Sequence, residues 1–342
     1  MNVQQKRIVV FDYLKAFAII LVVANHYGHT SWSYLIKNTL VYPAIIQMAV
    51  PIFMIVTGCT FSMSYNKKYS KITEMYKPKE LIVRVLRFWI PFFFAFVFEV
   101  VMSAILLNMS FTPLSLVKAF LVGGPGLNGS YYIPVLVQLV FVFPLIFTAI
   151  KKHNNKGLLL CMTVNLIYEV LCSQLKINSG LYRILMPRYI TYVALGCWLY
   201  FNNYRINKKF SVAAFTLGFA YVIIRYYGLF GYTEPIIFKL WTATSMVIAL
   251  YIFPVVSILI SKLKNYSPTD SKTNKIILTI GNASFHIFLV QMIYYNLFNN
   301  YIINLFNYPV LNIPLNLMIC ITVGILFYNT EKGISKRILS KF

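Results

Sequence analysis

Long, uninterrupted apolar segments constrain the fold of this chain more than any other feature of its sequence. Each segment has about 20 residues, which is the length at which an α-helix crosses the hydrocarbon core of a bilayer. Strands of a membrane barrel would be shorter and would alternate in polarity, so the segments predict helices. We place them at residues 8–28, 41–62, 82–107, 130–150, 157–175, 187–202, 210–228, 236–261, 276–297 and 313–330. We therefore expect an all-α fold, a polytopic transmembrane helical bundle of about ten spans.

The overall composition excludes an ordinary soluble domain. The chain has 342 residues, of which 59% are hydrophobic and only 11% are charged, and its mean hydropathy is +0.70. Soluble domains carry about a quarter charged residues. No linker or change of composition divides the sequence, so we expect one transmembrane domain over residues 1–342. We expect a multi-pass protein of the cell membrane, and the Asn-, Lys- and Ile-rich composition favours a bacterial cytoplasmic membrane.

The net charge of +23 follows the order of the apolar segments. Lysines and arginines are concentrated in every second connection, beginning with the N-terminal one. The alternate connections contain only Lys37, Lys118, Lys176 and Arg183. Cytoplasmic loops of membrane proteins are enriched in Lys and Arg, so the pattern predicts that both termini are cytoplasmic. Basic residues distributed in this way indicate orientation in the membrane, and we expect no nucleic-acid partner.

The first apolar segment contains ionisable side chains, which are costly inside a bilayer and indicate a functional site. Lys15 and His26 are eleven residues apart, close to three helical turns, so they share a face and are separated by about 16 Å along the axis. Asp12 precedes Lys15 by three residues and is placed to pair with it. Histidine suits general-base chemistry because it exchanges a proton near neutral pH. The alternative for His26 is a hydrogen-bonded residue at the end of a span.

Two arginines begin the third apolar segment on the cytoplasmic side. Arg84 and Arg87 are three residues apart and share a helix face. The guanidinium group presents a planar set of donors that suits phosphate. The pair is therefore a candidate site for the phosphates of a nucleotide-bearing cofactor. The alternative is that both side chains extend to the lipid headgroups.

Other polar residues are weaker candidates for function. Glu99, Glu169 and Arg225 lie within expected spans, and we interpret them as structural pairing partners. His286 fits a packed polar residue better than a catalytic one. The stretch 114–122 is interpreted as a re-entrant or interfacial piece. The sequence contains no Walker loop, GxSxG elbow or HExxH helix, and we expect no bound metal.

In their order along the chain, these features resemble the acyltransferase 3 family of integral membrane acyltransferases. The spacing of Lys15 and His26 resembles the family's basic-X10-His signature, and Arg84, Arg87 and Pro91 resemble the start of its third span. Later motifs of the family resemble residues 129–134 with Gln138 and Pro144, then 189–196, 284–289 and 331–332. The resemblance covers nearly the whole chain.

The sequence departs from the family pattern at several positions. Lys15 stands where Arg is commoner, which keeps the charge but removes the planar fork of donors. Gln291 stands where many members carry a second His, and Tyr131 stands where Trp is frequent. We recognise no appended extracytoplasmic domain. The acceptor is therefore expected to reach the membrane domain directly or with the help of a separate protein.

The resemblance implies O-acylation, usually O-acetylation, of a cell-surface polysaccharide or a lipid-linked glycan. The donor is expected to be acetyl-CoA or another acyl-CoA on the cytoplasmic side. On this interpretation Arg84 and Arg87 bind the CoA phosphates, and Lys15 stabilises the donor or its thioester oxygen. His26 either deprotonates the acceptor hydroxyl or carries the acyl group briefly.

Aromatic and basic residues at the outer side complete the expected site. Tyr131 and Tyr132 are candidates for stacking on a sugar, with an interfacial aromatic belt as the alternative, and Arg188 is a further candidate for substrate binding. The expected partners are membrane lipid, the glycan or lipid-linked sugar acceptor, and proteins of polysaccharide synthesis. Two other functions remain open. The chain is alternatively a transporter or flippase of a sugar or lipid-linked glycan, or a non-catalytic subunit of a polysaccharide-synthesis complex.

Overall fold

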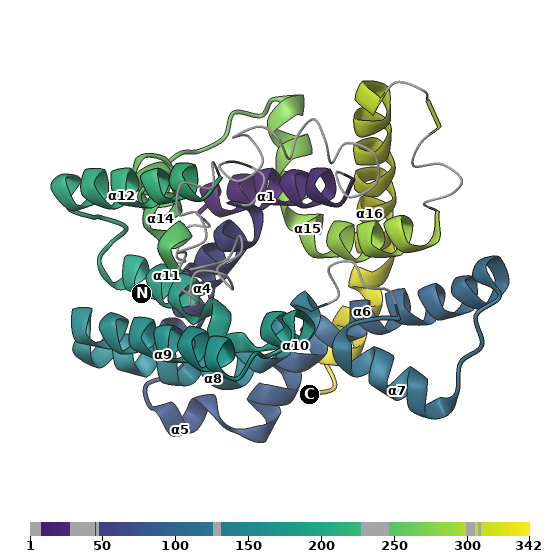
Figure 1. The fold of residues 1–342 in the computed structure, drawn as a ribbon, viewed down its shortest axis with the longest axis horizontal. Coiled ribbons are helices and arrows are strands. Elements are labelled where there is room, and N and C mark those ends of the chain that lie inside the picture. The colour runs from purple at the N-terminus through teal and green to yellow at the C-terminus, as the bar shows by residue number, and fades with distance from the viewer. Residues whose placement is uncertain are drawn as a thin grey trace.

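The structure is a computed structural model that describes residues 8–27, 45, 48–125, 131–226, 246–298, 305–306 and 309–342. Every regular element in these ranges is a helix, and several of the longest lie side by side (Figure 1). The elements are α1 (Val10–Tyr27), α4 (Ala49–Lys68), α5 (Ile72–Met75), α6 (Pro78–Leu107), α7 (Pro113–Val122), α8 (Tyr132–His153), α9 (Asn155–Gln174), α10 (Ser179–Ile184), the 3₁₀ helix η2 (Met186–Tyr189), α11 (Ile190–Phe201), α12 (Lys208–Tyr226), α14 (Met246–Leu263), α15 (Lys272–Leu297) and α16 (Pro309–Leu339).

Each of the ten expected apolar segments coincides with one helix, from α1 to α16. The all-α prediction is therefore confirmed for the described residues. In that part of the chain five helices are long and apolar enough to cross a bilayer, namely α6, α8, α9, α15 and the stretch Leu311–Leu339 of α16. These helices make the chain a multi-pass membrane protein. The count of ten spans and the cytoplasmic position of both termini stay predictions.

Some helices differ in length from the expected segments, for local reasons. The segments 41–62 and 236–261 lie partly outside the described residues. The helix in the first of them, α4, begins at Ala49 and continues to Lys68. The last turns of α4 and α16 are polar, so hydropathy alone placed their ends too early. In contrast, α11 is only twelve residues long because η2, which contains Pro187, precedes it.

The stretch 114–122 forms α7, a helix with well-defined ends. Thr112 caps its N-terminus by accepting a hydrogen bond from the backbone N–H of Ser115 at 3.2 Å, and Gly123 ends it with φ of +100°. None of its residues is buried, but Phe120 packs against Phe92 of α6 with ring centroids 5.0 Å apart. The interpretation of α7 as re-entrant or interfacial stays a prediction.

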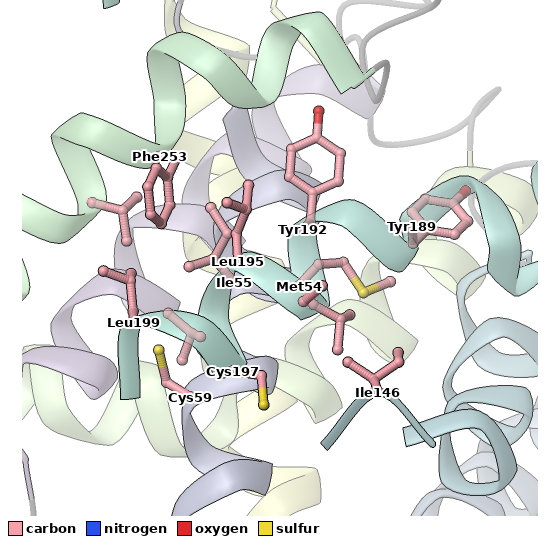
Figure 2. Packing of buried hydrophobic residues seen from close by; sticks show 14 of the residues in the cluster. Met54, Ile55, Cys59, Ile146, Tyr189, Tyr192, Leu195, Cys197, Leu199 and Phe253 are labelled. Atoms are coloured by element: carbon pink, nitrogen blue, oxygen red, sulfur yellow. The ribbon is translucent and has the colours of Figure 1, made fainter. Parts of the chain in front are cut away.

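Two glycines allow α4 and α11 to approach closely at the centre of the core. A Cβ atom on Gly58 would lie 2.2 Å from the carbonyl oxygen of Val193, and one on Gly196 would lie 2.0 Å from that of Ile55. Cys59 and Cys197 are buried among apolar side chains beside this contact (Figure 2). Small residues at a helix contact let the backbones meet, which is a common way of packing helices in membranes.

Helix α1 packs against α15 and contacts that helix near both of its own ends. Near its start, a Cβ atom on Gly281 would lie 2.1 Å from the carbonyl oxygen of Asp12, so the two backbones touch. Near its end, the Tyr295 hydroxyl donates a hydrogen bond to the carbonyl oxygen of Val23 at 3.1 Å. The helix that contains Lys15 and His26 is therefore fixed along its length.

Candidate active site

Asp12 and Lys15, in the first turns of α1, form an ion pair at one end of the candidate site. The Lys15 ammonium lies 2.8 Å from the Asp12 carboxylate, which confirms the expected pairing. The Lys15 side chain is 28% exposed, whereas that of Asp12 is 5% exposed. The carboxylate is therefore enclosed by protein, and the ammonium group keeps an accessible side.

His26 lies in the last turn of the same helix and is partly buried. Its ring stacks on that of Tyr295, with centroids 6.4 Å apart and an interplanar angle of 29°. Because α1 is continuous from Val10 to Tyr27, Lys15 and His26 lie on one helix face, as their spacing predicted. The helix thus joins a cation near one end to an imidazole near the other.

The end of α15 next to His26 connects to three other helices, which the sequence analysis did not predict. Tyr295 contacts α1, as described above. Its neighbour Tyr294 donates a hydrogen bond to Asn316 of α16 at 2.5 Å, and Asn296 donates one to Glu99 of α6 at 2.9 Å. The sequence signal was available, since three polar residues follow one another at the end of an apolar segment.

Glu99 is buried next to the loop that follows α7. Only 2% of the residue is exposed, and a Cβ atom on Gly124 would lie 3.1 Å from one of its carboxylate oxygens. Gly124 has φ of +143°, a conformation that favours glycine. The loop after α7 therefore passes close to the Glu99 carboxylate, which accepts a hydrogen bond from Asn296 of α15.

Tyr131, Tyr132 and Arg188, the candidates that we expect at the outer side, lie in two different environments. The Tyr132 ring packs against Phe288 of α15, with centroids 5.1 Å apart. The Tyr131 ring instead stacks on Tyr189 of η2 at 6.4 Å. Arg188 follows Tyr131 into this second environment, where its guanidinium lies 5.5 Å from the Tyr189 centroid. The structure thus groups Tyr131 with Arg188 and separates both from Tyr132.

Arg188 belongs to a buried cluster rather than to an open surface. The residue is 3% exposed, and its guanidinium lies 4.4 Å from the centroid of the Tyr182 ring. The Tyr182 hydroxyl donates to the carboxylate of Glu169 at 2.6 Å. Glu169 and Glu99 therefore each accept a hydrogen bond from a separate partner, and the side chain of Arg225 lies outside the described residues.

The two arginines of α6 have different surroundings, although they are three residues apart. Arg84 is buried, with its guanidinium 4.0 Å from the centroid of Tyr65 and its Nη2 atom 3.4 Å from the Tyr69 hydroxyl. Arg87 is exposed. The burial of Arg84 depends on aromatic residues of α4, which the spacing within α6 did not show. The role of both arginines in phosphate binding stays a prediction.

A cleft of about 660 Å³ lies beside Tyr69, where the ends of α4 and α8 meet α5 and the start of α6. Four of its lining residues are lysines, and we call it the lysine cleft: Lys67, Lys68, Lys77 and Lys151. Neither Arg84 nor Arg87 lines it. The sequence did not predict this cleft, because Lys151 is far from the other three along the chain.

His286 and Gln291 are buried on α15. His286 Nε2 lies 2.9 Å from the Glu331 carboxylate, and its ring packs against Phe327 at 5.0 Å, as a packed polar residue would. Gln291 is fully buried, and neither polar atom of its amide has a hydrogen-bond partner among the described residues. Those residues also contain no cluster of three His, Cys, Asp or Glu side chains arranged to hold a metal ion.

Comparison with known proteins gives one match. A family model described as an acyltransferase domain, Acyl_transf_3, matches residues 8–329. No curated protein matches the chain, and no solved structure does. The matched range includes every candidate residue described above.

Proposed function

This chain belongs to the acyltransferase 3 family and is therefore a membrane acyltransferase, and we propose that it is an O-acyltransferase of glycans. The donor is acetyl-CoA or another acyl-CoA on the cytoplasmic side. The acceptor is a hydroxyl group of a cell-surface polysaccharide or of a lipid-linked glycan. The protein acts in the cell membrane, which for a bacterial protein is the cytoplasmic membrane.

The observation that carries this proposal is the arrangement of α1. One continuous helix holds the accessible ammonium of Lys15 and the partly buried imidazole of His26 on one face, about 16 Å apart along its axis. Its contacts with α15 near both ends fix that separation. A transfer that takes its donor from one side of the membrane and its acceptor from the other needs groups at both depths.

Two reaction routes account for every bond formed and broken and for the proton of the acceptor hydroxyl. In the direct route His26 takes the proton of the acceptor hydroxyl, and the oxygen attacks the thioester carbonyl. The C–O ester bond forms as the C–S bond breaks, and the proton leaves with the CoA thiol. In the second route His26 first accepts the acyl group and then passes it to the hydroxyl, whose proton neutralises the released thiolate.

The other candidate residues support these routes by position. Lys15 offers a positive charge to the donor near the cytoplasmic end of α1, about 16 Å along the helix from the carbonyl that reacts at His26. Arg84 and Arg87 lie on the helix that begins at the lysine cleft, and they add positive charge at the donor side. Tyr131, whose ring stacks on Tyr189 beside Arg188, offers an aromatic ring at the acceptor side.

The experiment uses purified protein in proteoliposomes, with radiolabelled acetyl-CoA inside and the surface glycan or its lipid-linked precursor outside. We expect label on the glycan with the native protein and a loss of at least about a thousandfold with His26→Ala, since the base or acyl carrier is removed. His153→Ala is the matched control, because His153 is exposed at the end of α8. It should leave the rate unchanged.

Two results would contradict the proposal. Equal transfer by the native protein and His26→Ala would remove His26 from the chemistry. Failure of the native protein to label any acceptor from several acyl-CoAs would favour the transporter interpretation, and glycan flux across the same vesicles would then be measured.

A further inference from the structure

The lysine cleft joins two segments that are far apart in sequence. Lys67 and Lys68 end α4, Lys77 immediately precedes α6, and Lys151 lies in the last turn of α8. The charge pattern of the sequence assigns both segments to the cytoplasm. The fold therefore gathers cytoplasmic lysines from separate connections around one volume of about 660 Å³.

The carboxylates in this cleft are already engaged. Glu80 lies 2.6 Å from the Lys68 ammonium and also accepts a hydrogen bond from the Tyr69 hydroxyl. Glu74 accepts hydrogen bonds from the backbone N–H groups of Ser70 at 2.9 Å and Lys71 at 3.2 Å. These bonds hold the pKa of Glu74 below its usual value, so it remains ionised at the start of α5.

Three lysines of the cleft are exposed, namely Lys67, Lys77 and Lys151, and in the part of the chain that the structure describes none of them lies within ion-pairing distance of a carboxylate. Lys77 is near enough to Glu74 to help lower the pKa of that carboxyl group, and the Lys151 ammonium lies 5.4 Å from the centroid of the Phe147 ring. The four lysines of the cleft outnumber its two carboxylates, so an excess of positive charge remains there. This excess favours a polyanionic ligand.

Arg84 adds a permanent positive charge behind the cleft. The residue is only 7% exposed, and it reaches the cleft through Tyr69, whose hydroxyl it contacts at 3.4 Å. Its Nε atom has no hydrogen-bond partner among the described residues. A buried charge is screened less by salt than an exposed one, so Arg84 raises the positive potential in the cleft without binding the ligand itself.

We propose that the lysine cleft binds the phosphate groups of the acyl-CoA donor, with the ammonium groups of Lys67, Lys77 and Lys151 as phosphate ligands. This proposal rests on the proposed function, in which acyl-CoA is the donor. CoA carries a diphosphate and a ribose 3′-phosphate, and lysine binds such groups as a mobile point charge. The lysines of the cleft are thus the phosphate ligands. Arg84 raises the positive potential around them and does not itself contact the phosphates.

Two triple variants test the site with equal changes of net charge. The cleft variant combines Lys67→Gln, Lys77→Gln and Lys151→Gln. The control combines exposed lysines of the same connections that do not line the cleft, as Lys71→Gln, Lys79→Gln and Lys156→Gln. Binding of CoA and of dephospho-CoA is measured by calorimetry in nanodiscs of phosphatidylcholine.

We expect the cleft variant to raise the Kd of CoA by about tenfold or more, since charge-assisted contacts to phosphate are lost. The control variant should stay within about twofold of the native protein. Native protein should bind dephospho-CoA more weakly than CoA, and the cleft variant should lose that difference. Equal CoA affinity in the two triple variants would overturn the proposal.

Anionic lipid offers the same phosphate chemistry from another source. The calorimetry is therefore repeated in nanodiscs that contain phosphatidylglycerol. If this lipid abolishes CoA binding to the native protein, the cleft is a headgroup site and the proposal is wrong. Unchanged CoA affinity in these nanodiscs supports the donor as the ligand.

A donor without phosphates separates this proposal from the proposed function. The cleft variant should show a raised KM for acetyl-CoA and unchanged turnover of S-acetylpantetheine. Equal losses with both donors would show that the lysines do not act through the phosphates. If the native protein transfers acetyl from neither donor, the proposed function fails, and the CoA affinities still decide what the cleft binds.

Discussion

The ion pair of Asp12 and Lys15 keeps two charges within the first turns of a helix that continues into the bundle. Lys15→Arg retains the charge, and we expect it to keep most of the acyl-transfer activity. Lys15→Met removes the charge, and we expect the KM for acyl-CoA to rise about tenfold, since one charge-assisted contact with the donor is lost. Initial rates in proteoliposomes measure both effects.

The same substitution also removes the ion-pair partner of a buried carboxylate, which is destabilising in its own right. The double variant Asp12→Asn with Lys15→Met separates the two effects, since it removes both charges. Full recovery of activity in the double variant would show that Lys15 only neutralises Asp12. Continued loss, with normal thermal stability, would show that Lys15 itself acts on the donor.

Spacing along the sequence predicted the arrangement of some site residues and not of others. The spacing of Asp12, Lys15 and His26 predicted their arrangement because all three lie on one helix, whose geometry is local. The spacing of Arg84 and Arg87 predicted a shared face but not their different burial. That difference arises from rings of α4, and no pattern within α6 contains this information.

Helices as units were the most predictable part of the molecule. Apolar length depends only on neighbouring residues, so all ten expected segments found a helix. Helix ends were less predictable, as the polar last turns of α4 and α16 show. The short helices α5 and α10 were missed, because neither is long enough to produce a hydropathy signal.

The contact between α4 and α11 allows a test of packing. In Gly196→Ala the new methyl group would meet the backbone oxygen of Ile55 at 2.0 Å, so the helices must separate. We expect this variant to lose about 1–3 kcal/mol of stability, as overpacked cores do. Thermal unfolding in detergent, followed by circular dichroism, measures the change.

Gly333→Ala is the matched control for this experiment. It also lies in a helix, but a Cβ atom there would meet nothing within 4 Å. Alanine favours helix over glycine, so this variant should be as stable as the native protein or slightly more stable. Equal melting temperatures for the two alanine variants would contradict the close helix contact.

At the scale of the whole molecule, orientation in the membrane is open to direct measurement. The five native cysteines are buried, so a membrane-impermeant maleimide should react mainly with an introduced cysteine. We expect Lys71→Cys and Lys341→Cys to react only from the cytoplasmic side, and Lys118→Cys only from the outside. The native protein provides the background.

Labelling of Lys71→Cys and Lys341→Cys from opposite sides would show that the number of spans between them differs from the one predicted. The charge pattern predicts sides, but it does not predict which loops meet in space. The lysine cleft is an example, since Lys151 lines the same cleft as Lys67 only because α8 packs against α5 and α6. Function at this scale therefore required the folded structure.

The last turn of α15 is hydrogen-bonded to three other helices. Tyr294, Tyr295 and Asn296 are consecutive, and each holds a different helix, so α16, α1 and α6 share one anchor point. A tilt of α1 that moved His26 would have to break the hydrogen bond from Tyr295 to Val23, or it would have to move α16 and α6 as well. The imidazole is thus held in a fixed frame, and substrates must come to it.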